Sequence, residues 1–270
     1  MPLIKIDEKQ DAKYIDGTKL GHREKLIART FAGFLRGHPC QGARLSIVKG
    51  GVFLSIVSDM TSVESAFNVL NDLREYFGVS DSLGATEKTL AVAFYAEPIG
   101  SQEQFAEQYW KFVQLLHDLD CQTFEWDNTV SPVINDTNFE LSLSGRAIFT
   151  TTLNPSNPRF ARKFSYPVWV MNQLSQFNWL RQNGQFSNWQ QRIRDLDSKF
   201  DPSGVPNPIL TDHGKASSAA QLAGSVPKKL NFSYRSSASE RALALEKAIV
   251  QAREEGCKFD IIMALEALRK

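Results

Sequence analysis

Apolar side chains recur every three or four residues in several stretches of this chain, the spacing that gathers them on one face of a helix. Between positions 22 and 36 the recurring residues are Leu26, Ile27, Phe31, Phe34 and Leu35. A helix is therefore predicted there, ended by Gly37, because glycine readily takes the left-handed conformation that follows many helices. Helices are also predicted over these ranges: 173–182 and 186–199, on either side of Gly184, then 237–255 and 259–269.

Two short sequences have the form of a capping box, in which a serine or threonine side chain and an acid or amide three residues later satisfy the first backbone amides of a helix. They are TSVE at 61–64 and SQEQ at 101–104. The first predicts a helix to about Phe77, and the second a helix to His117 or Asp118.

The strand signals are two pairs of β-rich runs joined by turn residues, and one continuous apolar run. Residues 43–48 and 52–57 flank Lys49-Gly50-Gly51 and are predicted to form a hairpin. A second hairpin is predicted from 139–143 and 147–152 across Ser144-Gly145, and the run at 89–96 predicts a buried strand.

Strands and helices therefore alternate along the chain, and the hairpins favour an α+β fold. The expected architecture is a mixed, largely antiparallel sheet with packed helices. We expect one domain over residues 1–228 and a C-terminal helical extension over 229–270, which is amphipathic and a candidate homodimer contact. Residues 201–228 are rich in proline, serine and glycine and are predicted to be a long loop.

The composition narrows the classes of protein. The 270 residues include 31 basic and 30 acidic side chains, a balance that predicts no nucleic-acid partner. No apolar run is long enough to cross a membrane, and the charged first 17 residues do not resemble a secretory signal. The 18 phenylalanines and 5 tryptophans predict an aromatic core able to hold a flat, apolar ligand.

Three widely spaced cysteines, Cys40, Cys121 and Cys257, predict neither a disulfide framework nor a zinc site, and fit a reducing, cytoplasmic compartment. Cys40 follows His38-Pro39 at a junction between two predicted elements. This junction is either a metal or thiol site, or a tight turn with a buried cysteine, and the residues alone favour the turn.

His117 shares a helical face with Trp110 and Val113. An imidazole on such a face can bind haem iron, with Asp118 or Asp120 as an acceptor for its second nitrogen. The alternative is a histidine that only complements the negative end of the helix dipole.

A small basic cluster, Arg159, Arg162 and Lys163, follows a proline-rich loop. It either pairs with carboxylates, of a haem or of a substrate, or lies solvated on the surface. The acids Asp136, Glu140 and Asp212 are candidates for holding a cationic substrate. His22 and His213 stand alone and are expected to be surface or structural residues.

Several of these segments together resemble the YqcI/YcgG family, over residues 25–226. They include Pro39-Cys40 before an apolar run, the segment from Trp110 to Asp120, the stretch NFELSLSGRAIFTTTLNP and the basic cluster that follows it. The stretch FSYPVWVMNQLSQFNWLR and the late segment 207–224 complete the resemblance.

The resemblance implies a haem-dependent monooxygenase that hydroxylates an amine or guanidine nitrogen, notably of arginine, in natural-product biosynthesis. It implies haem b, and dioxygen with an electron donor or peroxide. His117 ranks first as the iron ligand and Cys40 second, with His38 beside it, and the basic cluster is expected to bind the haem carboxylates or a substrate carboxylate. Asn154 stands where the family commonly has histidine, so it joins Glu140 and Asp136 as a candidate substrate residue. The alternatives are a non-catalytic haem or small-ligand binding protein, and a haem-free structural protein.

Overall fold

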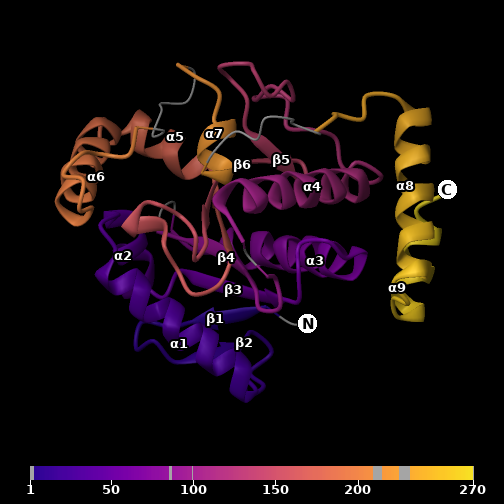
Figure 1. Ribbon diagram of the computed structural model, residues 1–270, viewed down its shortest axis with the longest axis horizontal. Helices are drawn as coiled ribbons and strands as arrows, with labels where there is room; N and C mark the ends of the chain where they lie inside the picture. Colours follow the sequence, from indigo (N-terminus) through magenta and orange to yellow (C-terminus); the bar gives the residue numbers. More distant parts are fainter. Residues whose placement is uncertain (1–2, 85–86, 99, 209–214, 225–231, 270) are drawn as a thin grey trace.

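The computed structural model describes residues 3–84, 87–98, 100–208, 215–224 and 232–269. Its centre is a seven-stranded mixed sheet, in the order β2-β1-β3-β4-β7-β6-β5 (Figure 1). Among the described strands only β3 and β4 pair in parallel, and every other neighbouring pair is antiparallel. The α+β fold with a largely antiparallel sheet is therefore confirmed. The strands are β1 (Ile4–Ile6), β2 (Ala12–Tyr14), β3 (Val52–Val57), β4 (Thr89–Phe94), β5 (Leu141–Leu143), β6 (Arg146–Leu153) and β7 (Val168–Gln173).

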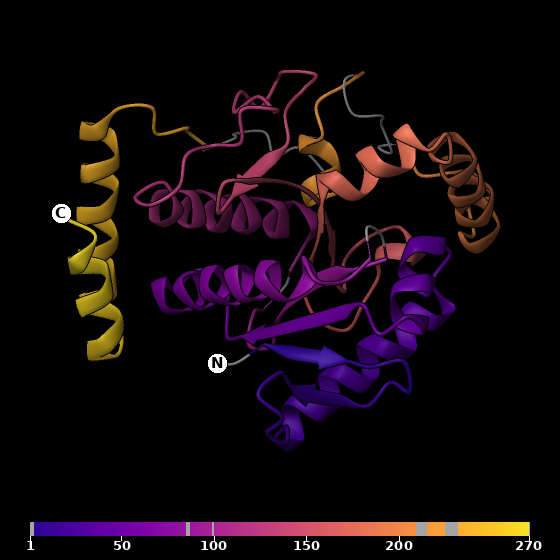
Figure 2. The same cartoon turned by 180° about the vertical axis from the view of Figure 1, so that it is seen from behind.

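Helices cover both faces of this sheet. Helices α3 and α4 lie side by side over one face, while α1 packs on the other, and α2, α5 and α6 continue along that second side (Figures 1 and 2). The described helices are α1 (His22–Gly37), α2 (Gln41–Val48), α3 (Val63–Ser80), α4 (Gln102–Asp120), α5 (Leu174–Gln182), α6 (Phe186–Phe200), α7 (Ala219–Ala223), α8 (Ala238–Glu254) and α9 (Phe259–Ala267).

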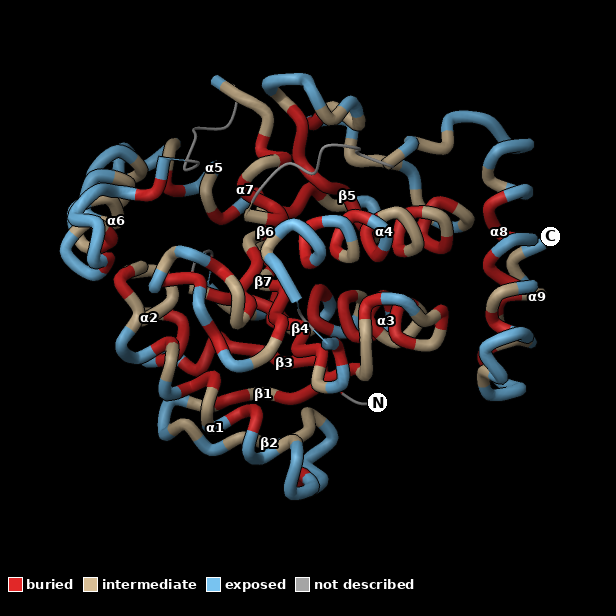
Figure 3. The backbone as a smooth tube through the Cα atoms, viewed as in Figure 1, coloured by how far each residue is buried: buried red, intermediate tan, exposed pale blue. Residues whose placement is uncertain are grey.

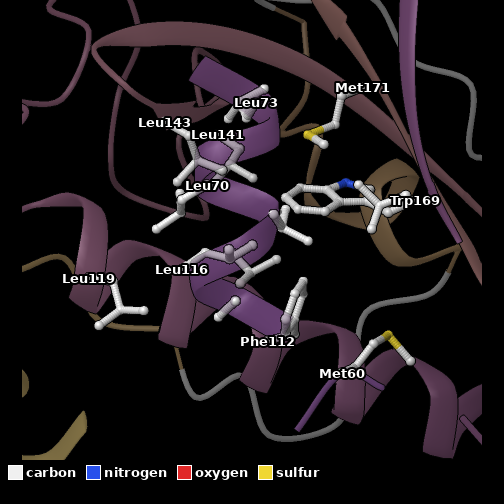
Figure 4. Close-up of a cluster of buried hydrophobic side chains, with 14 of the residues drawn as sticks. Met60, Leu70, Leu73, Phe112, Leu116, Leu119, Leu141, Leu143, Trp169 and Met171 are labelled. Carbon is white, nitrogen blue, oxygen red and sulfur yellow. The ribbon is translucent and has the colours of Figure 1, made fainter. Parts of the chain in front are cut away.

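The alternation of side chains along β7 divides the interior into two cores. Trp169 and Met171 point into the core beneath α3 and α4, whereas Val168 and Val170 face the α1 side. The sheet and the inner faces of α3 and α4 form the buried centre in Figure 3, and Figure 4 shows Trp169 beside Phe112 of α4. Burying aromatic side chains of this size supplies much of the stabilisation of the fold.

The first predicted hairpin is wrong in its first half. Residues 43–48 lie in helix α2, and the strand β3 pairs instead with β1 on one side and β4 on the other. Both hydrogen-bonding edges of β3 are therefore occupied, which leaves no edge for residues 43–48. Gly50 has a φ of +62° and follows the end of α2, so the glycine pair ends a helix where a hairpin turn was predicted.

The capping predictions are confirmed at α4 and shifted at α3. Ser101 and Gln104 form the complete capping box, and α4 runs on to Asp120. At α3 the cap is Ser62, one residue later than the pattern predicted, and its side chain accepts a hydrogen bond from the amide of Ser65. The left-handed end predicted at Gly37 is also wrong, because Gly37 is helical and His38 follows it in an extended conformation.

The second predicted hairpin is confirmed. Strands β5 and β6 pair across Ser144 and Gly145, whose φ values of 53° and 69° are the two positive angles of a type I′ turn. The paired helices α5 and α6 are also confirmed near their predicted bounds. The predicted loop at 201–228 contains the short helix α7.

The C-terminal helices α8 and α9 are present as predicted, and the domain boundary at 228 and 229 lies outside the described residues. Helix α8 crosses the ends of α3 and α4 (Figure 2), and its Leu245 and Ile249 join the core beneath those helices. The ion pair between Arg241 and Glu125 links α8 to the body. Among the described residues, no helix combines the length and apolar character needed to cross a lipid bilayer.

Candidate functional site

A cavity of about 270 Å³ lies on the α1 side of the sheet, between the strands β6 and β7 and the helices α5 and α6. Its floor is made by side chains that point to this face of the two strands: Phe149, Thr151 and Leu153 of β6, and Val170 and Asn172 of β7. The register places Phe149 opposite Asn172 and Thr151 opposite Val170, so the floor is continuous. Such a concave, largely apolar site is the usual form of a ligand-binding pocket.

The far wall of the cavity is formed by the two paired helices. Phe186, Trp189 and Ile193 come from α6, and Phe177 and Leu180 come from α5. The helical spacing predicts both helices, but it does not show that these side chains line a cavity. The wall and the floor together present aromatic and aliphatic surface to whatever binds between them.

His38 fixes the junction between α1 and α2 at one end of the cavity. Its Nε2 lies 2.7 Å from the carbonyl oxygen of Ala161, which can only accept, so Nε2 donates. Its Nδ1 accepts a hydrogen bond of 3.0 Å from the amide of Cys40. Burial lowers the pKa of His38 to about 4, which keeps the ring neutral at pH 7. Both ring nitrogens are thus engaged by the backbone, and His38 acts here as a positioning residue.

Cys40 is the residue that His38 positions, and it occupies the N-cap of α2 while lining the cavity. Burial raises the pKa of the Cys40 thiol, and the amides of Ala43 and Gly42 together with the cations of Arg44 and Arg162 oppose that rise. A cysteine in such a place becomes a thiolate when a further positive charge compensates its burial, as a bound metal ion does. In the thiolate form, the sulfur of Cys40 would be able to bind a metal ion or act as a nucleophile.

Arg162 brings a guanidinium and Glu140 a carboxyl group to the cavity wall. Arg162 comes from η1 (Phe160–Arg162) and is buried, and its Nη1 donates a hydrogen bond of 3.0 Å to the carbonyl of Gln221 in α7. Burial lowers the pKa of Arg162 to about 10, with Asp197 opposing the shift, so the guanidinium stays charged at pH 7. Glu140 directly precedes β5 and is also buried.

Three other predicted site residues do not line this cavity. Arg159 pairs with Asp197 at 2.6 Å and with Asp201 at 3.3 Å, and so holds η1 to the end of α6. Lys163 is exposed beside it. Asp136 is exposed and accepts a hydrogen bond from the amide of Asn138 in a local turn. The basic cluster therefore divides, and only Arg162 faces the cavity.

Asn154 is fully buried at the end of β6 and likewise lies outside the cavity lining. Its Nδ2 donates to Oε1 of Gln102 at 2.9 Å, and its Oδ1 accepts from the amide of Ser156. Gln102 in turn donates to the carbonyl of Ala223 in α7. This amide chain joins the start of α4, the end of β6 and α7, so Asn154 holds these three elements together.

His117 lies on the other side of the sheet and does not line the cavity. Its ring stacks on Tyr234 and contacts Trp126 and Phe232, and its Nε2 accepts a hydrogen bond of 3.0 Å from the amide of Arg235. Its neighbour on α4, Asp118, pairs with the guanidinium of Arg235 at 2.7 Å. His117 therefore holds the segment that leads into α8.

The remaining candidates of the sequence analysis do not contribute to the cavity as described. His22 is exposed at the start of α1, and Asp212 and His213 lie outside the described residues.

The placement of His117 predicts a pH-dependent stability. Burial lowers its pKa to about 4, below the value of about 6.5 for an unfolded histidine. Between these values the unfolded chain binds a proton that the folded chain does not, so stability falls as the pH drops through this window. The free energy of unfolding is therefore measured by urea unfolding between pH 7 and 4. It should fall more steeply with decreasing pH in the unsubstituted protein than in His117→Gln, by about 1 kcal/mol per pH unit.

The matched control is His22→Gln, at an exposed position. Its pH slope should equal that of the unsubstituted protein. Equal slopes for all three proteins would show that folding does not lower the pKa of His117, and would contradict the buried arrangement.

The YqcI/YcgG family model matches residues 29–230, so this chain belongs to the YqcI/YcgG family. The matched region contains every residue that lines the cavity, whereas α8 and α9 lie beyond it. No curated protein and no solved structure matches the chain. Within the described residues, no three histidine, cysteine, aspartate or glutamate side chains gather as a metal-binding group.

Proposed function

We propose that this protein is a haem-dependent monooxygenase that N-hydroxylates a small amine or guanidine substrate, with arginine the leading candidate. Membership of the YqcI/YcgG family supports the proposal through the chemistry that the resemblance implies. The observation that carries it in this chain is the cavity itself, where the Cys40 thiol, the Arg162 guanidinium and aromatic walls come together. A cytoplasmic location, which keeps the free thiol of Cys40 reduced, is part of the proposal.

The residues that line the cavity fit a haem group. The floor of β6 and β7 and the wall of α6 offer flat apolar surface, and the guanidinium of Arg162 is a cation that could pair with a carboxylate. Cys40 offers sulfur as an iron ligand. His38 has both nitrogens engaged and His117 lies outside, so we place Cys40 ahead of both as the iron ligand.

The haem, when bound, would supply the oxygen-transfer chemistry, using dioxygen with an electron donor, or peroxide. The chain's own residues would bind and orient. The amides of Gly42 and Ala43 and the charge of Arg162 would stabilise negative charge on the sulfur of Cys40. Glu140 would accept hydrogen bonds from a cationic substrate group and fix which nitrogen faces the reaction centre, while the apolar walls exclude water and strengthen these charge interactions.

The proposal is tested first by the absorption spectrum of the purified protein, as isolated and after adding haemin. A Soret band that titrates to one haem per chain is expected. The loaded protein is then incubated with arginine and a panel of amines, under reductant and oxygen or with peroxide. A product heavier by one oxygen supports the proposal, and a protein that takes up no haem refutes it.

The second candidate is a haem or small-ligand binding protein without turnover. Two observations favour it: position 154 carries a neutral amide, and His38, the histidine among the described cavity residues, has no nitrogen left for proton transfer. This candidate predicts full haem loading with no oxidised product from any member of the panel.

The role of Glu140 gives a sharper prediction. Glu140→Gln keeps the shape of the side chain and removes its charge. Loss of a charge-assisted hydrogen bond should lower kcat/KM for a cationic substrate roughly 10–100-fold. Steady-state kinetics and the haem spectrum are measured together. The control Asp136→Asn, at an exposed acid, should change neither, and an unaltered kcat/KM in Glu140→Gln would remove Glu140 from the substrate site.

A further inference from the structure

Helix α6 is amphipathic, yet its apolar face is not packed into either core. Asp197 is its one buried residue, and Phe186, Trp189 and Ile193 are only half-buried. These three side chains line the cavity. Figure 3 shows α6 as mainly exposed and half-buried backbone at the edge of the molecule, and its neighbours are α5, α2 and η1. An apolar helical face that is half covered by protein gains stability from a ligand that covers the remainder.

The helix is attached to the body near its two ends. At its start, Gly184 separates α5 from α6 with a φ of +65°, and nothing lies within 4 Å of the place where a Cβ would be. Near its end, Asp197 pairs with Arg159 at 2.6 Å and accepts a hydrogen bond of 2.8 Å from the amide of Asn207. Arg159 also donates to the carbonyl of Val205.

Between these attachments, Trp189 lies against the N-terminus of α2. A Cβ built on Gly42 would be 3.2 Å from Cζ3 of Trp189 and 3.6 Å from Sγ of Cys40. Glycine at position 42 therefore permits the indole to sit close to the helix end that carries the cysteine. Trp189 and Cys40 thus lie on either side of Gly42, and both line the cavity.

We propose that α6 is a lid over the cavity, hinged at Gly184, latched by the ion pairs of Arg159 with Asp197 and Asp201, and sealed by Trp189 on Gly42, beside Cys40. Opening would rupture the ion pairs of Arg159 with Asp197 and Asp201 and the hydrogen bonds around them, without exposing either core, so it costs less than global unfolding. A flat, apolar ligand enters when the lid opens and then holds it closed. The identity of that ligand as haem rests on the proposed function, whereas the lid itself does not.

The test is amide hydrogen exchange of the full-length protein, followed by mass spectrometry. Arg159→Gln removes the latch, and exchange in residues 186–200 should rise about tenfold while exchange in α4 stays unchanged. The matched control is Arg192→Gln, the same substitution at an exposed position of α6, which should leave exchange unchanged.

The seal is tested by Gly42→Ala, which places a methyl group against Trp189. Exchange in α6 should rise about threefold, although alanine itself favours helix α2. The control Gly33→Ala adds the same methyl group in α1, where nothing lies within 4 Å, and should not change α6.

The exchange experiment is repeated with haemin as the ligand. Saturating haemin should slow exchange in α6, and Gly42→Ala and Arg159→Gln should both release haemin several-fold faster. Exchange in α6 that matches α4 and that neither variant alters would overturn the lid. If haemin does not bind, the proposed function fails, but selective opening of α6 in the two variants still establishes the lid.

Discussion

Cys40→Ser is expected to remove the thiolate signature from the spectrum of the ferrous–CO complex and to weaken haem binding more than about 100-fold. The physical reason is that serine is not deprotonated at neutral pH and cannot replace a thiolate as an iron ligand. Removing a residue that only orients a metal ligand lowers the affinity for the metal about 10–100-fold. Removing the ligand itself should therefore lower the affinity further. The measurements are a haemin titration and the ferrous–CO spectrum.

Two variants control this experiment. Cys121→Ser changes a buried cysteine at the end of α4, away from the cavity, and should leave the spectrum unchanged. His117→Gln should also leave it unchanged, because Nε2 of His117 already accepts the Arg235 amide. A spectrum that changes in His117→Gln and not in Cys40→Ser would instead assign the iron ligand to His117, the residue that the family resemblance ranks first.

Trp169→Ala is expected to cause the largest loss of stability. The indole is fully buried, with ring centroids 5.8 Å from Tyr109 and 6.2 Å from Phe112. Removing an aromatic side chain of this size from a packed core costs about 3–5 kcal/mol, because it loses the transfer free energy and leaves a cavity. The expected fall in Tm is roughly 6–20 °C for a chain of this length. Thermal and urea unfolding followed by circular dichroism measure both quantities.

The matched control is Trp179→Ala, the same substitution on α5, where the indole is 38% exposed. Its cost should stay within about 1 kcal/mol, since partly exposed positions outside the core contribute little. Equal losses in the two variants would show that the core around Trp169 relaxes to fill the space.

The sequence predicted correctly those helices and turns that are determined by residues close together in the chain. The capping box at Ser101 and Gln104, the type I′ turn at Ser144-Gly145 and the helices on either side of Gly184 all form as the sequence indicates. Each depends on contacts within a few residues or on a backbone angle that glycine favours. The fold class followed from these elements.

The prediction failed where distant segments compete for one position. Residues 43–48 have the composition of a strand, but β1 and β4 already occupy both edges of β3, and the segment forms α2. The short strands β1 and β2 and the strand β7 were not predicted from the sequence. A short apolar run such as VWVMNQ does not distinguish a buried strand from a buried helix, because both faces of it are covered.

The candidate site shows the same division. The sequence by itself identified the family, the helices α1, α5 and α6 and the β5–β6 hairpin at the cavity, and His38, Cys40, Glu140 and Arg162 among the residues that line it. Only the tertiary structure decided that His117 and Asn154 hold other parts of the fold, and that Trp189 of α6 lies close to Gly42, beside Cys40. The physical reason is that residue type and local spacing determine what a side chain is able to bind. Which face of the sheet it reaches, and which groups already occupy its polar atoms, depend on segments that lie far away in the sequence: 118 residues for the Arg235 amide on His117, and 52 for Gln102 on Asn154.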